Sequence, residues 1–528
     1  LHLLSRRQRQ MCIRDRTYGV NSLMAKVIES KKIDQKQFKS FMDPHLIYHD
    51  FSLFEEADET LERIEEAIAN KEKICIYGDY DCDGILATTI LVQAFHERGV
   101  EVGYHIPNRF TDGYGLNTTR VEQMAEKGYS LIITVDNGIK AFDAVEKAGE
   151  LGIDVIITDH HAFDGEVPVA YSIIHTKMSP KYPFKEICGG FIAYKLAAAL
   201  LKHHDHYLFT LASITTISDM MPLLDENRSL VRRGLQFMKQ YKYPSLELLK
   251  GSRDYDATTI GFTIAPRINA FGRLPELVNP VYLVKYFLKE ADPAYQEKIS
   301  NYASKINSKR QSLTTSLYKE AVTDTSSPCL FYGSENMHEG LVGLVAGKYT
   351  REYEQPAFVM HYNPKEEIYK GSARGIDGFN IYNFFTHHED LFVQYGGHAK
   401  AGGFTITKSN YPLVYDALMN DIKGCHFEAS ESVIPITLTD TTISNVESLD
   451  LLAPFGEENK APLFILEDVS CHQVDRLSEG KHLKFHLGDN QVSALAFNKG
   501  QLYDELVHKD SMTCLLYTSP SPRDRSVS

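Results

Sequence analysis

The segment KICIYGDYDCDG, residues 73–84, decides the fold of this chain. Its first part, Lys73–Tyr77, is a short apolar run that predicts a buried strand, and Ile85–Arg98, which follows the segment, has the pattern of a helix. The same alternation recurs downstream, with apolar runs at Leu131–Val135 and Val155–Thr158. Short buried strands that alternate with helices predict a parallel α/β sheet with helices on both faces. Ligands of such sheets bind beyond the carboxyl ends of the strands.

Composition narrows the class of protein. With 528 residues, of which 43% are hydrophobic and 24% charged, the chain has the composition of an ordinary globular protein. No stretch approaches the roughly 20 apolar residues that a membrane-spanning helix needs. Its eight cysteines are scattered and form no CxxC pair, which argues against a structural zinc or a disulfide framework and predicts a reducing, cytoplasmic location.

The net charge of −14 argues against a chain that coats itself with nucleic acid. It does not exclude a nuclease, because binding depends on local patches of charge rather than on the total. One such patch is predicted between Arg228 and Arg273, where nine Lys or Arg residues face three Asp or Glu residues. A solvated helical face is an equally good interpretation of that segment taken alone.

Acidic residues cluster after the first predicted strand. Asp79, Asp81 and Asp83 stand there at alternate positions. One such cluster is commonly a turn or a helix cap. However, three carboxylates this close repel each other and raise one another's pKa values unless a cation neutralises them. The cluster therefore indicates a metal site.

Three further motifs add possible ligands, each of them weak by itself. Asp136 follows the second predicted strand, Asp159-His160-His161 follows the third, and Asp219 follows a further apolar run, interpreted as a strand. A lone Asp is more often a helix cap, and a single His is as often a satisfied buried imidazole. Together, four carboxylate-bearing strand ends and one imidazole pair predict a mixed oxygen and nitrogen site for Mn²⁺ or Mg²⁺. Two such ions ~3.5–4 Å apart promote hydrolysis of phosphate esters.

The chain resembles the DHH phosphoesterase superfamily from about Tyr18 to Thr513. The matching motifs, in the superfamily's order and spacing, are Asp81-Cys82-Asp83-Gly84, Val135-Asp136-Asn137-Gly138, Asp159-His160-His161 and Ser218-Asp219-Met220. The stretch YGGHAKAGG, Tyr395–Gly403, is similar to the glycine-rich motif of the DHHA1 domain. Two more segments resemble ones found together in the RecJ family of single-strand-specific exonucleases: APRINAFGRL, Ala265–Leu274, and APFGEENKAPLF, Ala453–Phe464.

The patterns and the resemblance together predict the order of the domains. Both ends of the chain look foreign to their neighbours and are left out of the fold prediction. Chains of the RecJ family run on past the position of Thr513, so the last domain, an OB-like β-barrel, is expected to be incomplete. The predicted segments are a non-native-looking leader, 1–16; an N-terminal helical extension, 17–70; a parallel-sheet DHH catalytic domain, 71–226; a helical connector, 227–328; a smaller α/β DHHA1 domain, 329–428; the OB-like domain, predicted as a small antiparallel β-domain, 429–513; and a non-native-looking tail, 514–528.

The resemblance implies two metal sites that share one carboxylate. Asp81 and Asp136 would hold the first ion, and Asp136 would also bridge to the second. In many family members a His at the position of Tyr77 ligates the first ion, so that ion is expected to be held more weakly here or completed by water. The residues implied as ligands are Asp81, Asp83, Asp136, His160 and Asp219, the last four for the second ion.

The same resemblance implies the catalytic and substrate-binding residues. His161 would face the scissile phosphate, where an imidazole stabilises developing charge, with Asp136 and Asp159 in the same catalytic group. The second lobe offers a guanidinium, a hydroxyl, an imidazole and glycine amides, which grip phosphate oxygens, although a glycine-rich turn between strand and helix is the alternative. The residues implied for substrate binding are Arg109 and Arg273 at the 5′ end, Ser372, Arg374, Gly396, Gly397 and His398 in the second lobe, and Arg267 and Asn269 as weaker candidates.

The last domain resembles an OB-fold, whose barrels bind single strands through a basic groove and stacking aromatics. Four phenylalanines are candidates for stacking on bases. Alternating aromatics in a small barrel more often belong to its core, so that alternative is favoured. The four are Phe455, Phe464, Phe485 and Phe497.

The sequence therefore predicts a 5′→3′ exonuclease that hydrolyses single-stranded DNA with two ions, Mn²⁺ or Mg²⁺, in DNA repair and recombination. A single-strand-binding protein and a helicase are expected partners, and no membrane is. Two alternatives stay open: an oligoribonuclease or small-nucleotide phosphodiesterase with the same site, and a non-catalytic DNA-binding scaffold. The extension, the connector and the β-domain argue against the first, and the retained carboxylates argue against the second.

Overall fold

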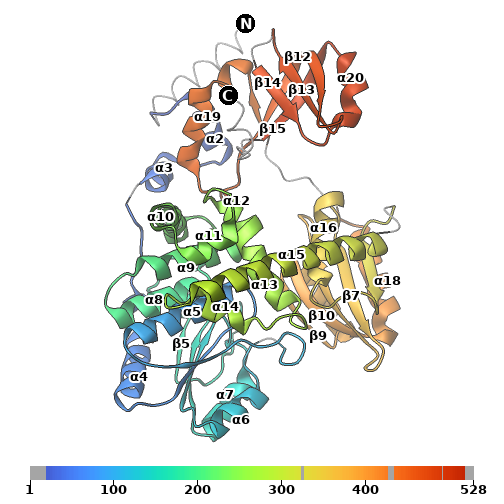
Figure 1. The fold of residues 1–528 in the computed structure, drawn as a ribbon. Coiled ribbons are helices and arrows are strands. Elements are labelled where there is room, and N and C mark those ends of the chain that lie inside the picture. The colour runs from blue at the N-terminus through green and yellow to red at the C-terminus, as the bar shows by residue number, and fades with distance from the viewer. Residues whose placement is uncertain are drawn as a thin grey trace.

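A computed structural model describes residues 19–43, 45–113, 115–163, 165–322, 326–425, 433–489 and 492–517. The strands in these ranges form three five-stranded sheets, one in each of three domains (Figure 1). The predicted leader, 1–16, lies outside the described residues. In the described part of the chain, no helix combines the length and apolar character needed to span a bilayer.

The first domain contains the predicted parallel sheet. Its strand order is β2-β1-β3-β4-β5, and each pair of neighbours runs parallel. The strands are β1 (Ile74–Tyr77), β2 (Gly103–His105), β3 (Leu131–Val135), β4 (Asp154–Thr158) and β5 (Ser172–Ile174). The helices are α4 (Ala57–Ala69), α5 (Cys82–Glu97), α6 (Thr118–Glu126), α7 (Phe142–Glu150), α8 (Gly189–Leu201) and α9 (His206–Ser218).

Alternate residues of the central strands face two different hydrophobic cores. Ile74 and Ile76 of β1 pack with α5, α8 and α9, whereas Cys75 and Tyr77 pack with α6 and α7 on the other side of the sheet. Both faces are therefore buried, which explains why the strands are apolar at every position instead of alternating.

A helical connector leads to the second domain. It consists of α10 (Asp225–Tyr241), α11 (Pro244–Lys250), α12 (Ala257–Thr259), the π-helix η3 (Ile260–Ile264), α13 (Ala265–Arg273), α14 (Val281–Phe287) and the long α15 (Pro293–Ala321). The second sheet has the order β6-β7-β8-β10-β9, in which only β6 and β7 run parallel. Its elements are β6 (Leu330–Ser334), α16 (Val342–Tyr353), β7 (Ala357–Asn363), β8 (Ile368–Arg374), α17 (Ile381–His387), β9 (Gln394–His398), β10 (Ala401–Thr407) and α18 (Tyr411–Ile422).

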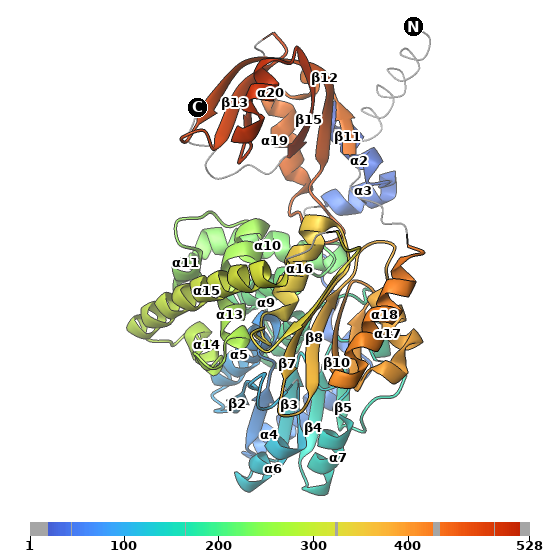
Figure 2. The ribbon, with the colours of Figure 1, turned by 90° about the vertical axis from the view of Figure 1, so that its right-hand side faces the viewer.

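The third domain joins the two ends of the chain. Helices α2 (Ser22–Ser30) and α3 (Gln35–Met42) pack into the hydrophobic core of the third sheet and lie beside β11 (Figure 2). The predicted N-terminal extension is therefore divided, because α4 packs on the first domain instead. The elements are β11 (Val433–Ile436), α19 (Ile443–Ser448), β12 (Leu463–Leu477), β13 (His482–Leu487), β14 (Val492–Ala496), α20 (Tyr503–Val507) and β15 (Ser511–Tyr517).

Two sequence predictions for the third domain are wrong. The sheet is mixed rather than antiparallel, because β11 pairs with β12 in parallel. Residues 514–517, assigned to a non-native-looking tail, belong to β15 and pair with β12. Both features depend on pairing between segments far apart in the sequence, which local pattern does not reveal.

One arginine ties the third domain to the helical connector. Arg228 of α10 is buried, and its guanidinium lies 3.6 Å from the centre of the Phe41 ring. It donates hydrogen bonds to the carbonyls of Leu452 at 3.0 Å, Ala453 at 2.9 Å and Phe41 at 3.2 Å, with longer bonds to Leu451 and Pro454. Burial, and then Arg232, lower the pKa of Arg228 to about 9. The carbonyls, rather than an acid, balance this buried charge among the described residues.

We expect Arg228→Met to loosen this junction, because methionine fills similar space but leaves buried carbonyls without donors. The expected cost is about 2–4 kcal/mol. Hydrogen exchange of the Leu223 amide, which donates to the Glu457 carbonyl across the junction, measures it and should become faster. Arg233→Met on the exposed face of the same helix is the control and should leave that amide unchanged. Equal exchange in both variants would contradict the role of Arg228.

Candidate metal centre and phosphate-binding cleft

The acidic motifs meet at the carboxyl edge of the first sheet. Asp79 and Asp81 follow β1, Asp136 follows β3 and Asp159 follows β4, and these three strands are neighbours in the sheet. Asp83 lies in the first turn of α5, for which Asp81 is the N-cap. Parallel neighbours end at the same edge, so the motifs converge as the sequence predicted.

The predicted strand before Asp219 is wrong. Asp219 follows helix α9, whose C-cap it forms, and its N–H donates to the Thr215 carbonyl. Helix α9 packs against α5, and this contact brings Asp219 to the cluster from above the sheet edge. A buried apolar helix has no polar face, so its sequence resembles that of a buried strand.

His160 lies at the centre of the cluster. Its Nε2 is 3.1 Å from Oδ1 of Asp136, 3.5 Å from Oδ2 of Asp219 and 3.8 Å from Oδ2 of Asp83. The ligand atoms of each of three groups lie within 4.8 Å of one another. The groups are Asp83, His160 and Asp219; Asp79, Asp81 and Asp136; and Asp136, His160 and His161.

These groups overlap the two predicted ligand sets and add two residues, Asp79 and His161. Asp79, which was not among the predicted ligands, joins Asp81 and Asp136. Its side chain is 3% exposed, and its Oδ1 accepts no hydrogen bond from the described residues. The sequence feature that could have identified Asp79 as a ligand is its position in the alternating series Asp79, Asp81 and Asp83.

Two glycines missed from the sequence support the carboxylates. Gly189 and Gly190 begin α8, and their N–H groups donate to Asp83 at 2.8 and 2.7 Å. A Cβ on Gly189 would lie 2.5 Å from Cβ of Asp136, and one on Gly190 would lie 2.8 Å from Oδ1 of Asp83. Only glycine lets this helix N-terminus approach so closely, and its orphan N–H groups favour the charged form of Asp83.

Burial dominates the electrostatics of the carboxylates. Burial first, and then the neighbouring carboxylates, hold the pKa values of Asp79, Asp136 and Asp219 well above the usual range. Burial and then Asp81 raise the pKa of Asp83 to about 6, against the effect of the α8 amides. A cation between these groups would favour their charged forms, and carboxylates with one imidazole suit Mn²⁺ or Mg²⁺.

Asp159 orients the histidines and is in none of the three groups. Its carboxylate accepts the N–H of Ile139 at 3.0 Å and bonds Nδ1 of His161 at 2.8 Å. Burial opposes ionisation of both partners, but their attraction lowers the pKa of Asp159 and raises that of His161 to about 9. Burial and then His161 lower the pKa of His160 to about 3. His160 is therefore a neutral ligand candidate and His161 a cationic neighbour.

Tyr77 lies away from the predicted first metal site. Its ring is buried in the core on the α6 and α7 side, and its hydroxyl donates to the Gly115 carbonyl at 3.1 Å. The ring also lies 5.1 Å from that of His105. The tyrosine is thus part of the packing, while Asp79 stands nearer the place that a further ligand would take.

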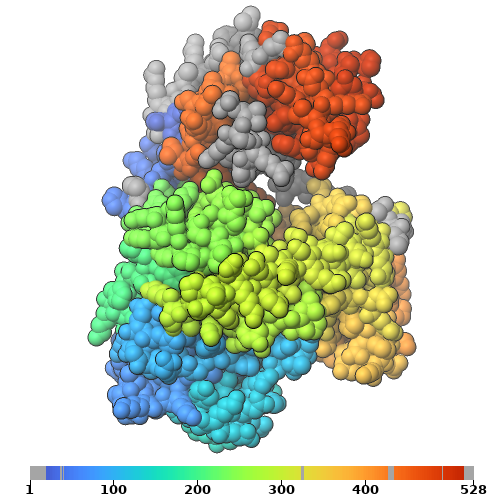
Figure 3. Space-filling view, in the orientation of Figure 1, coloured from blue at the N-terminus to red at the C-terminus, as the bar shows by residue number. Residues whose placement is uncertain are grey.

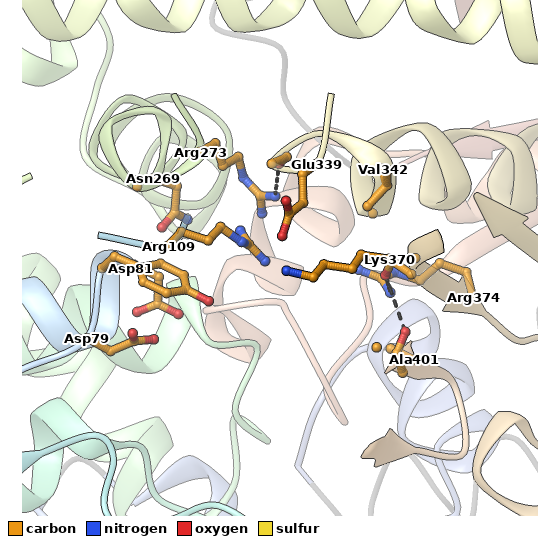
Figure 4. A pocket seen from close by; sticks show the side chains of 18 of the residues that line it. Asp79, Asp81, Arg109, Asn269, Arg273, Glu339, Val342, Lys370, Arg374 and Ala401 are labelled. Atoms are coloured by element: carbon orange, nitrogen blue, oxygen red, sulfur yellow. Dashed lines mark hydrogen bonds between the residues drawn. The ribbon is translucent and has the colours of Figure 1, made fainter. Parts of the chain in front are cut away.

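A cleft between the first and second domains adjoins the cluster, with a cavity of about 410 Å³. Figure 4 shows Arg109, Arg273 and Lys370 pointing into the space between Asp81 and Arg374. Asn269 also lines it and accepts the Cys82 N–H at 2.7 Å. Lys370 was missed from the sequence. Ser372 lines the cavity as predicted, but Arg267 does not; it donates to the Leu249 carbonyl elsewhere.

The arginines of the cleft have no acidic partner among the described residues. Arg374 donates to Oγ of Ser372 at 2.7 Å and to the Ala373 carbonyl, and Arg109 lies over the Tyr80 ring at 4.9 Å. Burial, and then the neighbouring Arg109, lower the pKa of Arg273 to about 9 and also lower that of Arg374. Such guanidinium groups suit phosphate, which would neutralise them.

The glycine-rich stretch lines a second cavity, of about 840 Å³, that also reaches His161. Gly396, Gly397 and His398 belong to β9, which pairs with β10, so the alternative of a turn between strand and helix is wrong. Lys140 lies across this cavity from them. His161 therefore lines both cavities.

The aromatic candidates of the third domain mostly belong to its core. Phe464 and Phe485 are buried, and Phe455 packs against the same core. Only Phe497 of the four is exposed, at 49%. The favoured alternative, that these aromatics are core residues, thus describes three of the four.

Comparison with known proteins identifies all three domains. The description "DHH family, N-terminal domain" matches residues 73–218, "DHHA1 domain" matches 321–424 and "RecJ OB domain" matches 434–520. The single-stranded-DNA-specific exonuclease RecJ of Bacillus subtilis is 34% identical over 470 residues, 85% of this chain and 59% of its own. That of Salmonella typhimurium is 30% identical over 488 residues, 84% of this chain and 83% of its own.

A solved structure agrees with this likeness. The crystal structure of RecJ from Thermus thermophilus in complex with Mn²⁺ matches with a TM-score of 0.81 and 26% identity, over 96% of this chain and 74% of that one. The chain spans 59% and 65% of the length of the Bacillus subtilis and Thermus thermophilus relatives. By its three domains and these relatives, the chain belongs to the RecJ family.

Proposed function

We propose that this chain degrades single-stranded DNA from its 5′ end, hydrolysing phosphodiester bonds with two divalent ions, Mn²⁺ or Mg²⁺. The observation that carries the proposal is the arrangement of opposite charges about His161. Two groups of carboxylates, one with Asp79, Asp81 and Asp136 and one with Asp83 and Asp219, meet at His160 beside a cleft whose arginines form no ion pair with the described residues. A strand with a terminal phosphate would complement both, because ions held by the carboxylates would attract one phosphate and the arginines would attract another.

The ligand sets fit two such ions. Asp81 and Asp136, with Asp79, would hold the first, and Asp83, Asp136, His160 and Asp219 would hold the second. The unsatisfied Oδ1 of Asp79 and the raised pKa values of the buried carboxylates support cations at these places. When bound, the ions lower the pKa of a bridging water and stabilise charge on the phosphate.

The protein's own groups would position the reacting phosphate. His161, held by Asp159, would present a cationic imidazole to both cavities that it lines and would stabilise negative charge that develops on the phosphate. Asp159 acts through His161 as a positioning residue. Arg109, Arg273, Ser372 and Arg374 would bind the 5′ phosphate, and Gly396, Gly397 and His398 the strand in the second cavity.

The family of the chain supports the substrate. The relatives are named single-stranded-DNA-specific exonucleases, and the OB-like domain is of the type that binds single strands. A role in DNA repair and recombination in the cytoplasm, with a helicase and a single-strand-binding protein as partners, is proposed on family membership alone. No observation favours a dinucleotide substrate, and the retained carboxylates argue against a scaffold without activity.

Strands labelled at either end test the activity. We expect a 5′-labelled single strand to lose its label at once as mononucleotide with Mn²⁺ or Mg²⁺, and a duplex with blunt ends to resist. Gel electrophoresis over a time course measures both. Release of a 3′ label first would reverse the polarity, and rapid cleavage of dinucleotides with slow cleavage of long strands would favour the small-nucleotide enzymes.

Removing the shared carboxylate tests the metal centre. In EDTA, Asp136→Asn should be more stable than the wild type, on the order of 1 kcal/mol, because one buried like charge is lost. Asparagine also suits the positive φ of 62° at this position. With Mn²⁺ the order should reverse, since only the wild type gains the full free energy of metal binding, and hydrolysis should be lost in the variant.

Thermal unfolding with and without Mn²⁺ measures this reversal. Asp416→Asn, on the exposed face of α18, is the matched control and should respond to Mn²⁺ as the wild type does. A variant at Asp136 that is still stabilised by Mn²⁺ and still hydrolyses DNA would exclude the shared-ligand assignment.

The arginine cleft is tested by the chemistry of the 5′ end. We expect Arg374→Ala to raise KM at least tenfold for a 5′-phosphorylated strand, because a charge-assisted contact contributes about 1.5–3 kcal/mol. For the same strand with a 5′ hydroxyl, KM should change little. Steady-state kinetics on both substrates measure the difference. An equal loss on both would assign Arg374 to the frame of the cleft instead of to the terminal phosphate.

A further inference from the structure

Phe262 is exposed to an unusual degree for a phenylalanine. Its side chain is 80% exposed, although it lies between buried residues in the π-helix η3. Short π-helical segments are rare and often mark functional positions. A single exposed apolar side chain needs no explanation by itself, so its surroundings decide.

One face of the connector leads from Phe262 to the cleft. The helix is continuous through η3 and α13, and its residues that are not buried include Phe262, Pro266, Asn269 and Arg273. These stand at i, i+4, i+7 and i+11, the spacing of one helix face. Asn269 and Arg273 line the arginine cleft. Phe262 therefore continues the cleft-lining face, about 10 Å along the axis from Asn269.

The metal cluster lies close to the same segment. A Cβ on Gly261 would lie 3.6 Å from Cγ2 of Ile217, so η3 packs on the end of α9, two residues before Asp219. Met220, which follows Asp219, donates its N–H to the Ile217 carbonyl and is itself 69% exposed, with φ at 55°. Two exposed apolar side chains, Phe262 and Met220, thus belong to the segments that meet where η3 packs on the end of α9, close to Asp219.

The charge about this segment favours a polyanion. Arg267 lies one turn beyond Phe262 on α13, with Arg253 close enough to contribute to its electrostatics. Helix α12, directly before η3, lies at the end of the core that faces the OB-like domain (Figure 1), and Figure 3 shows the molecule hollowed between that domain and the core.

We propose that Phe262 is a stacking platform for a base of the substrate strand. The base belongs to a nucleotide on the 3′ side of the scissile bond, because Phe262 lies at the end of the helix face opposite to Arg273 and the 5′-phosphate cleft. Aromatic side chains bind bases of any sequence through their π faces, which suits an enzyme that must read every sequence. The inference rests on the proposed function, since that function sets the direction of the strand.

Fluorescence of 2-aminopurine tests the platform directly. The probe is a 5′-phosphorylated 12-mer with one 2-aminopurine at a position from 2 to 6, bound by the Asp136→Asn protein so that it is not consumed. Stacking on a ring quenches this fluorophore, so we expect quenching at one or two adjacent positions. Phe262→Leu, which keeps an apolar side chain without a ring, should abolish that quenching and raise Kd about 5- to 100-fold. Phe262→Trp should retain both.

A matched aromatic serves as the control. Tyr171, 48% exposed, directly precedes β5 and so lies at the amino edge of the first sheet, opposite to the metal cluster. Tyr171→Leu should bind and quench as the unaltered protein does. Equal quenching and Kd with and without the Phe262 ring would overturn the platform.

Kinetics separate failure of the platform from failure of the proposed function. In the otherwise wild-type protein, Phe262→Leu should raise KM several-fold for the 12-mer and less than twofold for a 5′-phosphorylated dinucleotide, which is too short to reach Phe262. If the wild type hydrolyses neither substrate, the proposed function fails, while quenching still reports on the platform. A dimer of the wild type in sedimentation velocity that Phe262→Leu dissociates would assign this face to a second copy and overturn the platform.

Discussion

The constraint on which the rest depends is the burial of like charges at one edge of a parallel sheet. Asp79, Asp83 and Asp136 are at most 3% exposed, and Asp219 joins them from a helix end. Such a cluster is unfavourable unless cations enter, so the frame about it must be stiff enough to hold it. The frame supplies fixed donors in place of solvent: the N-terminal amides of α8 reach Asp83, and His160 stands among the carboxylates. The N-terminus of α8 can come this close to the carboxylates because residues 189 and 190 are glycines.

Positive charge gathers in the adjoining cleft, where Asp79, Asp81 and His161 line the same cavity as the arginines. The arginines are half-buried and form no ion pair with the described residues, and under the proposed function a phosphodiester strand with its ions would neutralise both sets of charges. Under the proposed function, this pairing would let an acidic protein act on a polyanion: the net charge of −14 describes the whole chain, while the cleft presents Arg109, Arg273, Arg374 and Lys370. The order of the groups, arginines, then metal ligands, then an exposed ring, also gives the strand a direction.

Much of the first domain was predictable because its signals are local. A buried parallel strand is a short apolar run, and the residues after it must lie at the ligand-binding edge, so Asp81, Asp83, Asp136 and His160 could be placed together. What failed depended on packing between distant segments. Asp219 follows a buried helix that resembles a strand in sequence, and α2 and α3 join a sheet some 400 residues away, as the Asn21–Ser448 and Lys26–Asp440 contacts show. Gly189 and Gly190 are required because a Cβ at either position would clash with Asp136 or Asp83. Such a clash can be recognised only from coordinates. Arg267 belongs to the basic segment of the sequence, but its guanidinium donates to the Leu249 carbonyl outside the cleft.

The junction at Arg228 bears on how a long strand could be held. The third domain is fixed to the core by neutral carbonyls around a buried guanidinium and by the packing of Phe41 on it. Added salt weakens such contacts only a little. Contacts between phosphates and basic residues weaken steeply, because at high salt the release of counterions from the nucleic acid contributes less free energy to binding. Salt should therefore change the grip on DNA without changing the position of the OB-like domain relative to the cleft. Under the proposed function, a strand that leaves the metal cluster past η3 would meet a surface whose distance from the cluster is set by the fold and not by the ionic strength of the solution.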